Sequence, residues 1–156
     1  MPIARRDFLA AGIGLAAAAA PLHGRVLGAN DRINIGLIGC GVRGTYLFNE
    51  AMAAAPGRLN VVAACDVWAP AREKFGALVG EKLGQRPRLV SRYQDLLTTP
   101  GVDAVIIPTP DHAHCHVLMD AVRAGKDAFV EKPLSVRLED AVAALDLVKA
   151  NRQVVQ

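Results

Sequence analysis

Aromatic residues and clusters of basic residues are both scarce in this sequence. Phe, Trp and Tyr make up 4% of the 156 residues. The formal net charge of +3 falls to +1 when residues 1–29 are set aside, because 15 Lys and Arg residues then stand against 14 Asp and Glu residues. No basic stretch with interleaved aromatic side chains remains, and such stretches mark nucleic-acid-binding surfaces. We therefore expect no nucleic-acid partner.

Long hydrophobic runs are also absent. The longest candidate, residues 10–20, is Ala-rich and shorter than the roughly 20 apolar residues that span a bilayer, so no stable membrane anchoring is expected. It follows Arg5-Arg6 and Phe8-Leu9, and a charged start, a short apolar middle and a small-residue end are typical of an export signal of the twin-arginine type. An amphipathic N-terminal helix is the alternative, but the Ala-rich run offers no polar face.

We therefore predict that residues 1–29 form a twin-arginine-type signal segment and that the protein is exported, to the periplasm or the extracellular space. With 52% apolar residues, the remaining 30–156 can build one hydrophobic core and a single domain.

Cysteine is rare, and the three cysteines are odd in number. Cys40 and Cys65 stand at the ends of two predicted strands, where a disulfide between them is conceivable. Buried free thiols are the expected state, because a protein that folds before export does so in a reducing cytoplasm.

One segment has the residue types of a metal site. The segment contains Asp111, His112, His114, Cys115 and His116. His112 and His116 are four positions apart and would lie on one face of a helix. No second pair of ligands stands elsewhere in the sequence. We therefore predict that the protein holds no metal.

The rest of the chain is organised around the stretch from Ile33 to Phe48. A short apolar run, 33–38, is followed by Gly39, Gly41 and Gly44 in the spacing G-x-G-x-x-G. The first glycine permits a sharp turn, the second lets a pyrophosphate approach the backbone, and the third lets the next helix pack closely on the strand. That helix begins near Val42 and Arg43, with its positive end toward the phosphates. An ordinary strand-to-helix loop is the alternative.

The following strand strengthens the dinucleotide interpretation. Residues 58–66 form a second apolar run that ends at Asp66, 22 positions after Gly44. A carboxylate at this place binds the ribose hydroxyls of a dinucleotide. Asp66 as an N-cap of the next helix is the alternative. Because a carboxylate repels a 2′-phosphate and Val67-Trp68 supplies no adjacent arginine, we predict NAD in preference to NADP.

Helices and strands alternate along the remainder of the chain. Since strands alternating with helices give a parallel sheet, the predicted fold class is α/β, a doubly wound parallel sheet. Thr109 is expected to cap the helix after the fourth strand, with Pro110 at its first position. The expected strands are 33–38, 58–66, 88–91, 102–107, 127–130 and a sixth beginning at 154–155, and the expected helices begin at about 42 and cover 68–83, 93–98, 110–124 and 138–150.

The polar loops of this sheet fall at one edge. In an open parallel sheet the ligand binds outside the C-terminal strand ends, and Asp66, Thr109-Pro110 and Glu131-Lys132-Pro133 all follow strands. Lys132 as a simple surface lysine is the alternative to a functional role. Because the loop must turn sharply there and X-Pro bonds tolerate the cis form, we predict a cis peptide between Lys132 and Pro133.

Four motifs together resemble the N-terminal half of the Gfo/Idh/MocA oxidoreductases. They are the glycine motif at 36–44, Cys-Asp at 65–66, Thr-Pro-Asp-His-Ala-His at 109–114 and Glu-Lys-Pro at 131–133. The resemblance covers 30–156. It implies a Rossmann domain that lacks the family's second α/β domain, and a homo-oligomer for a full-length form.

The resemblance also assigns roles to residues. It implies a nicotinamide cofactor on Gly39, Gly41, Gly44 and Asp66, with Thr109, Pro110 and His114 along it. Glu131 and Lys132 are then expected near the nicotinamide, with Lys132 as the catalytic residue that touches substrate or assists proton transfer. Arg137 stands where the family often has a Thr that caps the last helix.

Three functions follow from the resemblance. The first is an oxidoreductase that passes hydride between nicotinamide and a sugar or polyol, with a carbohydrate as the small-molecule substrate. The second is an NAD-dependent glycosidase resembling the α-N-acetylgalactosaminidases, which oxidises the sugar transiently and reduces it again. The third is a cofactor-binding fragment without chemistry, since 30–156 alone is expected to be inactive.

Overall fold

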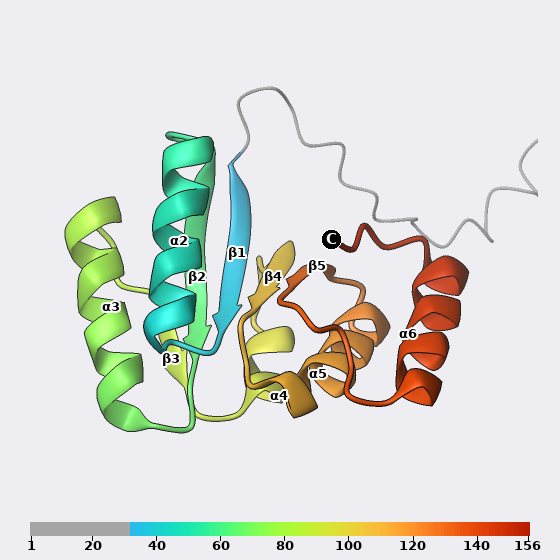
Figure 1. Ribbon diagram of the computed structural model, residues 1–156. Helices are drawn as coiled ribbons and strands as arrows, with labels where there is room; N and C mark the ends of the chain where they lie inside the picture. Colours follow the sequence, from blue (N-terminus) through green and yellow to red (C-terminus); the bar gives the residue numbers. More distant parts are fainter. Residues whose placement is uncertain (1–31) are drawn as a thin grey trace, which may run out of the picture.

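The computed structural model describes residues 32–156, so the predicted signal segment at 1–29 lies outside the described residues. Strands and helices alternate along the described chain (Figure 1), which confirms the predicted α/β class. The elements are β1 (Ile33–Ile38), α2 (Val42–Ala54), β2 (Leu59–Cys65), α3 (Ala69–Leu83), β3 (Arg88–Val90), α4 (Tyr93–Leu97), β4 (Ala104–Ile107), α5 (Asp111–Arg123), β5 (Asp127–Val130) and α6 (Leu138–Asn151).

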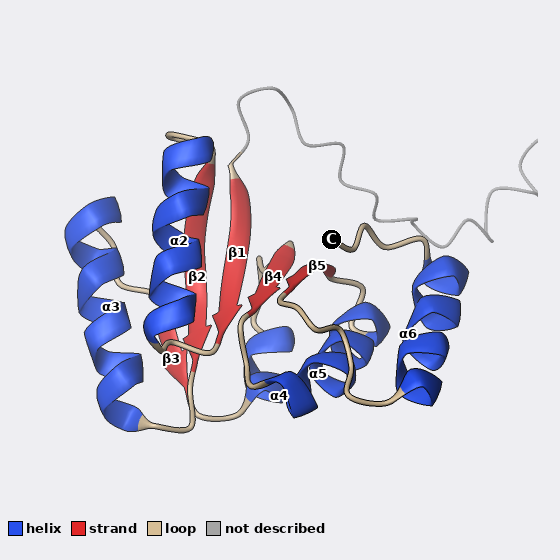
Figure 2. Cartoon of the chain, in the orientation of Figure 1, coloured by secondary structure: helices blue, strands red, loops and turns tan. Residues whose placement is uncertain are grey.

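The five strands form one parallel sheet in the order β3-β2-β1-β4-β5 (Figure 2). The strand order reverses between β1 and β4, because β2 and β3 lie on one side of β1 while β4 and β5 lie on the other. A doubly wound sheet binds its ligands at this reversal, outside the C-terminal ends of the strands. The glycine motif follows β1 and Thr109 follows β4, so both stand at the reversal.

Helices cover both faces of the sheet, as the near-continuous apolar strands predict. Ile35 and Leu37 of β1 belong to an apolar cluster that includes Phe48 of α2 and Phe75 of α3, whose rings meet edge to face at 5.3 Å between centroids. Ile38 belongs to a second cluster on the opposite face, formed with α4, α5 and α6. Neighbouring residues of β1 therefore pack into different apolar clusters on the two faces of the sheet.

The predicted sixth strand is present only as a single parallel bridge. Val155 pairs with Ala128 of β5, the amide of Ala128 donates to the carbonyl of Val154 at 3.0 Å, and Val130 donates to the carbonyl of Gln156 at 2.8 Å. The direction of this pairing is the one the alternation of elements predicts.

The predicted cap of α5 is wrong. Pro110, not Thr109, occupies the N-cap position, and α5 begins at Asp111 without a side-chain cap. The Thr109 hydroxyl has no hydrogen-bond partner in the described structure. Its main-chain carbonyl oxygen lies 2.6 Å from Nε2 of His114, five positions along the chain.

Candidate active site

The glycine loop has the geometry that its spacing predicts. Gly39 has φ +117°, a region that side chains other than glycine rarely adopt. A Cβ on Gly44 would fall on the carbonyl oxygen of Gly39, whereas a Cβ on Gly41 would meet no heavy atom within 4 Å. The first turn of α2, which begins at Val42, has no side-chain cap. The loop therefore leaves open space in front of main-chain N–H groups, as phosphate binding requires.

The Asp66 carboxylate is fixed next to this loop by main-chain donors. Its Oδ2 accepts from the amide of Cys40 at 2.8 Å, and its Oδ1 accepts from the amide of Trp68 at 2.8 Å. Asp66 is not the N-cap of α3, because that position belongs to Trp68. The carboxylate is thus held at the C-terminal end of β2, where a ribose-binding group is expected.

An arginine that the sequence analysis missed also contacts Asp66. Nη1 of Arg72, in the first turns of α3, donates to the main-chain carbonyl of Asp66 at 2.6 Å. The predicted preference for NAD rested on Val67 and Trp68, the two residues that follow Asp66. The structure places the Arg72 guanidinium against the main-chain carbonyl of Asp66, from the first turn of α3.

The two cysteines of this region are buried free thiols, as predicted, and so is Cys115. Burial, reinforced by the nearby Asp66 carboxylate, raises the pKa of Cys40 to about 12 and that of Cys65 to about 11. Both thiols therefore stay neutral near neutral pH and add no negative charge beside Asp66.

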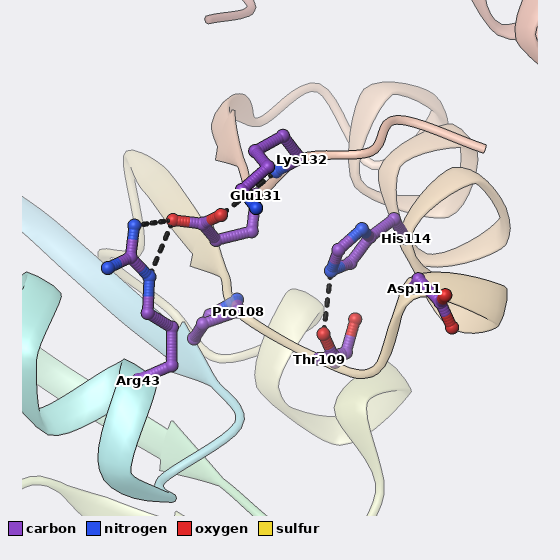
Figure 3. Close-up of a pocket in the computed structure, with 7 residues that line it drawn as sticks. All are labelled: Arg43, Pro108, Thr109, Asp111, His114, Glu131 and Lys132. Carbon is purple, nitrogen blue, oxygen red and sulfur yellow. Dashed lines mark hydrogen bonds and ion pairs between the residues drawn. The ribbon is translucent and has the colours of Figure 1, made fainter.

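At the other end of the site an ion pair links two distant elements (Figure 3). Nε of Arg43, in the first turn of α2, donates to Oε1 of Glu131 at 2.7 Å, and Nη2 donates to the same oxygen. The other carboxylate oxygen, Oε2, accepts from the amide of Lys132 at 3.0 Å. Arg43 holds the pKa of the buried Glu131 below its ordinary value, although burial opposes this. The carboxylate is therefore charged near neutral pH, and both of its oxygens accept hydrogen bonds.

Lys132 itself follows this pair with its side chain exposed. The peptide bond between Lys132 and Pro133 is cis, which confirms the prediction made from the turn. His114 reaches the same loop from α5: its Nδ1 lies 2.7 Å from the carbonyl oxygen of Pro133. Figure 3 shows these side chains around one cavity, with His114 and Glu131 on opposite sides.

Two adjoining cavities bring the predicted residues together. The larger, of about 860 Å³, contains Asp66 and the smaller, of about 390 Å³, contains Lys132. They share Arg43, Pro108 and Thr109, so they meet at the strand-order reversal. The predicted site residues that line the larger cavity are Gly39, Gly41, Val42, Arg43, Gly44, Asp66, Thr109 and Pro110. Those that line the smaller cavity are Arg43, Thr109, His114, Glu131 and Lys132.

The histidines of α5 do not converge. His114 is 2% exposed and both of its ring nitrogens are engaged by carbonyl oxygens, whereas His112 and His116 are exposed. Within residues 32–156 no group of three or more His, Cys, Asp or Glu side chains is arranged to hold a metal ion. In the same part of the chain, no helix has the length and apolar character needed to cross a bilayer.

The described residues fit a bound dinucleotide. The open approach at Gly41, the uncapped start of α2 and the fixed carboxylate of Asp66 supply the donors and acceptor that such a cofactor needs. The buried Thr109 hydroxyl has no partner among the described residues, and Thr109 lines both cavities. Buried hydroxyls are normally hydrogen-bonded, so this one fits a ligand group.

Comparisons with known proteins agree with this geometry. The model of an oxidoreductase family with an NAD-binding Rossmann fold, Gfo/Idh/MocA, matches residues 33–156. The chain is 31% identical over 125 residues to scyllo-inositol 2-dehydrogenase (NAD(+)) from Bacillus subtilis, covering 80% of this chain and 35% of that protein. It is also 31% identical over 142 residues to glycosyl hydrolase family 109 protein 2 from Shewanella sp. strain ANA-3. This match covers 86% of this chain and 31% of that protein.

Among solved structures, the fold matches the WlbA dehydrogenase from Bordetella pertussis in complex with NADH and UDP-GlcNAcA. The TM-score is 0.71 and the identity 26%, over 81% of this chain and 35% of that one. The chain thus spans about a third of the length of these relatives. With the family model matched over nearly all the described residues, the chain belongs to the Gfo/Idh/MocA oxidoreductase family as an NAD-binding Rossmann domain.

Proposed function

We propose that this chain binds NAD across the two adjoining cavities and serves an oxidoreductase that acts on a sugar or polyol. The observation that carries the proposal is the continuity of the site, which runs from Asp66 through Arg43 and Thr109 to Lys132. Asp66 would hold the adenine ribose hydroxyls, the loop from Gly39 to Gly44 would hold the pyrophosphate, and the residues around Lys132 would hold the nicotinamide end. When bound, NAD supplies hydride transfer.

The residues at the lysine end then have separate tasks. Lys132 is exposed to its cavity and holds or moves the proton of a substrate hydroxyl. Glu131 is committed to Arg43 and to the Lys132 amide, so it orients the lysine loop and does not act as a base. The Thr109 hydroxyl donates to a cofactor oxygen.

A second candidate function is favoured by the likeness to the family 109 glycosyl hydrolase of Shewanella. In this reaction the sugar is oxidised transiently, the aglycone is eliminated and the sugar is reduced again, with no net change in NAD. The same described residues serve both reactions. A form of the protein that has the length of its relatives can separate the two functions. Net production of NADH would indicate the oxidoreductase, and release of the aglycone from a glycoside with no net NADH would indicate the glycosidase.

Titration of NAD and NADP by calorimetry tests the cofactor proposal. The Asp66 carboxylate accepts from ribose hydroxyls and repels a 2′-phosphate, so NAD is expected to bind at least tenfold tighter, which corresponds to about 1.4 kcal/mol. In Asp66→Ser, NADP affinity should rise because the Arg72 guanidinium stands close to the same position. The double variant that also carries Arg72→Gln is the control and should lose that gain. Tighter NADP binding by the unaltered chain would overturn the preference.

We also propose that the protein is exported folded, with its nicotinamide bound, by the twin-arginine route. The support is the Arg5-Arg6-Asp7-Phe8-Leu9 sequence before an Ala-rich run. Little free NAD is available outside the cell, so an exported enzyme must carry its cofactor and restore it in each turnover. Replacing both arginines by lysine should keep the protein in the cytoplasm. Export that persists in this variant, or purified protein without nucleotide, would contradict the proposal.

A further inference from the structure

Arg43 stands where the two cavities of the site meet. It is the second residue of α2, and it lines both the cavity of about 860 Å³ that contains Asp66 and the cavity of about 390 Å³ that contains Lys132. Of these two cavities, Gly41 lines only the larger and Glu131 only the smaller. The arginine side chain therefore lies between the glycine loop and the loop after β5.

Two neighbours orient the guanidinium of Arg43. One edge of the group, Nε and Nη2, donates to Oε1 of Glu131, with Nε at 2.7 Å (Figure 3). The central carbon, Cζ, lies 5.1 Å from the centre of the Tyr46 ring, one helical turn further along α2, which is within the range of a cation–π contact. Because the guanidinium is planar and its N–H donors have a fixed fork geometry, these two contacts set the direction of its remaining donors.

The guanidinium keeps donors for a second anion. The contacts with Glu131 engage Nε and Nη2, and Nη1 donates to no acceptor among residues 32–156. The Arg43 side chain is 52% exposed, so Nη1 is accessible to a ligand. Arginine stays protonated in proteins, and its donors match the oxygens of a phosphate as well as those of a carboxylate. Arg43 can therefore hold a carboxylate on one edge and a phosphate on another.

Glu131 extends this contact to Lys132. The carboxylate is 8% exposed, and the oxygen that Arg43 leaves open, Oε2, accepts from the main-chain amide of Lys132 at 3.0 Å. The amide of Glu131 donates to the carbonyl of Ile107, at the end of β4, at 3.1 Å. An unbroken series of hydrogen bonds thus runs from the guanidinium of Arg43 through one buried carboxylate to the backbone of Lys132.

We propose that Arg43 couples cofactor binding to the position of Lys132, by donating to a cofactor phosphate while it holds Glu131. The inference rests on the proposed function, because it requires the pyrophosphate at Gly41. Coupling between two sites is reciprocal. A bound phosphate therefore steadies the lysine loop through Glu131, and loss of the Glu131 carboxylate weakens phosphate binding. Glu131 is a positioning residue in this arrangement, since it contacts neither the cofactor nor the substrate.

Amide spectra of the ¹⁵N-labelled 156-residue chain, saturated with ADP or with AMP, test the coupling. Neither probe has a nicotinamide that could touch Lys132, and ADP differs from AMP by the second phosphate. We expect ADP to shift the Lys132 amide signal and AMP to leave it in place. The shift should vanish in Arg43→Gln and in Glu131→Gln. It should persist in Arg92→Gln, the control, which removes another arginine that lines the larger cavity.

Calorimetry with ADP supplies the second readout. The affinity should fall at least about tenfold in Arg43→Gln, because hydrogen bonds to a charged group are lost. In Glu131→Gln it should fall about fivefold, at the lower end of coupling between sites. The double variant should bind ADP no more weakly than Arg43→Gln, because both changes interrupt the same series of contacts. Tighter ADP binding by Glu131→Gln would show that Glu131 competes with the phosphate for Arg43, and it would overturn the proposal.

The outcomes also separate this proposal from the cofactor proposal. If NAD and ADP bind but the Lys132 signal does not move, or moves equally in Arg43→Gln, the coupling is overturned and the cofactor site stands. If neither NAD nor ADP binds, both proposals are overturned. Because Arg43 is half exposed, we expect Arg43→Gln to fold, so the test does not depend on the stability of Glu131→Gln.

Discussion

The two ends of the site are built in different ways. At the glycine end, between Gly39 and Asp66, the contacts are made by the main chain: a left-handed turn, the free N–H groups of α2, and a carboxylate held by two backbone amides. At the lysine end, around Lys132, side chains from α2 and α5 reach the loop after β5: Arg43 pairs with Glu131, and the ring of His114 contacts the carbonyl oxygen of Pro133.

This difference determines how each end can be disrupted. The glycine end depends on space, since its groups approach one another where a Cβ does not fit. The lysine end depends on polar side chains, since Arg43 pairs with the Glu131 carboxylate and the ring of His114 contacts main-chain carbonyl oxygens. Steric substitutions should therefore be most damaging at one end and charge substitutions at the other.

The largest effect is expected for Gly44→Ala. The added Cβ falls on the carbonyl oxygen of Gly39 and close to Leu37, which is 1% exposed. Since overpacking a well-packed site costs about 1–3 kcal/mol and more where backbone must move, we expect a loss of at least about 3 kcal/mol in the free energy of unfolding. Urea denaturation measures it, and a stability equal to that of the unaltered chain would contradict the packing role of Gly44.

The next effect is expected for Glu131→Gln. It removes the carboxylate from a buried pair and leaves Arg43 without its partner, so we expect a loss of about 2 kcal/mol, less than for fully buried pairs because the arginine is half exposed. The matched control is Glu73→Gln, which breaks the exposed Glu73–Arg86 pair and should cost less than about 0.5 kcal/mol.

The same residue predicts a pH dependence. Arg43 lowers the pKa of Glu131 in the folded protein below 4.5, so this contribution to stability is fully present above pH 4.5 and is lost as pH falls through the folded pKa. In Glu131→Gln the free energy of unfolding should therefore fall less steeply below pH 4.5. An identical acid slope in both proteins would show that the pair does not stabilise the fold.

A smaller effect, on binding and not on stability, is expected for Gly41→Ala. Its Cβ meets no atom of the protein, so the free energy of unfolding should change by less than about 0.5 kcal/mol. The methyl group occupies the space in front of the α2 amides, and NAD affinity should fall about tenfold, or about 1.4 kcal/mol. Unchanged affinity would show that the pyrophosphate does not approach here.

The smallest effect is expected for Arg137→Thr. Arg137 occupies the N-cap of α6 without a side-chain cap bond, and a threonine there can accept from the first-turn amides. We expect a gain of about 0.5–1 kcal/mol in the free energy of unfolding, with NAD affinity unchanged. A decrease in stability would mean that the Arg137 side chain stabilises α6 by another contact.

The sequence predicted the glycine end well because its signals are local. A turn glycine, a packing glycine and a strand-terminal Asp66 all act within one βαβ unit, and the structure places each as expected. The lysine end was predicted by residue type only. Arg43 and Glu131 are 88 positions apart, and no periodicity or spacing links residues at that separation.

Two residues show where local signals mislead. Thr109 is followed by proline and has the side chain of a good N-cap, yet its carbonyl bonds to His114 and its hydroxyl has no partner in the described structure. Arg72 lies six positions after Asp66, and its contact depends on the path of the chain into α3. In both cases the outcome depends on the path of the loop after the strand, which the residue types alone do not specify.

In the proposed function one NAD molecule bridges the two ends of the site. A crystal structure of the chain grown with NAD tests it most directly. We expect the adenine ribose hydroxyls on the Asp66 carboxylate, the pyrophosphate at Gly41 and the nicotinamide in the cavity lined by Glu131 and Lys132. A nicotinamide that lies outside that cavity, or a dinucleotide bound away from Asp66, would contradict it.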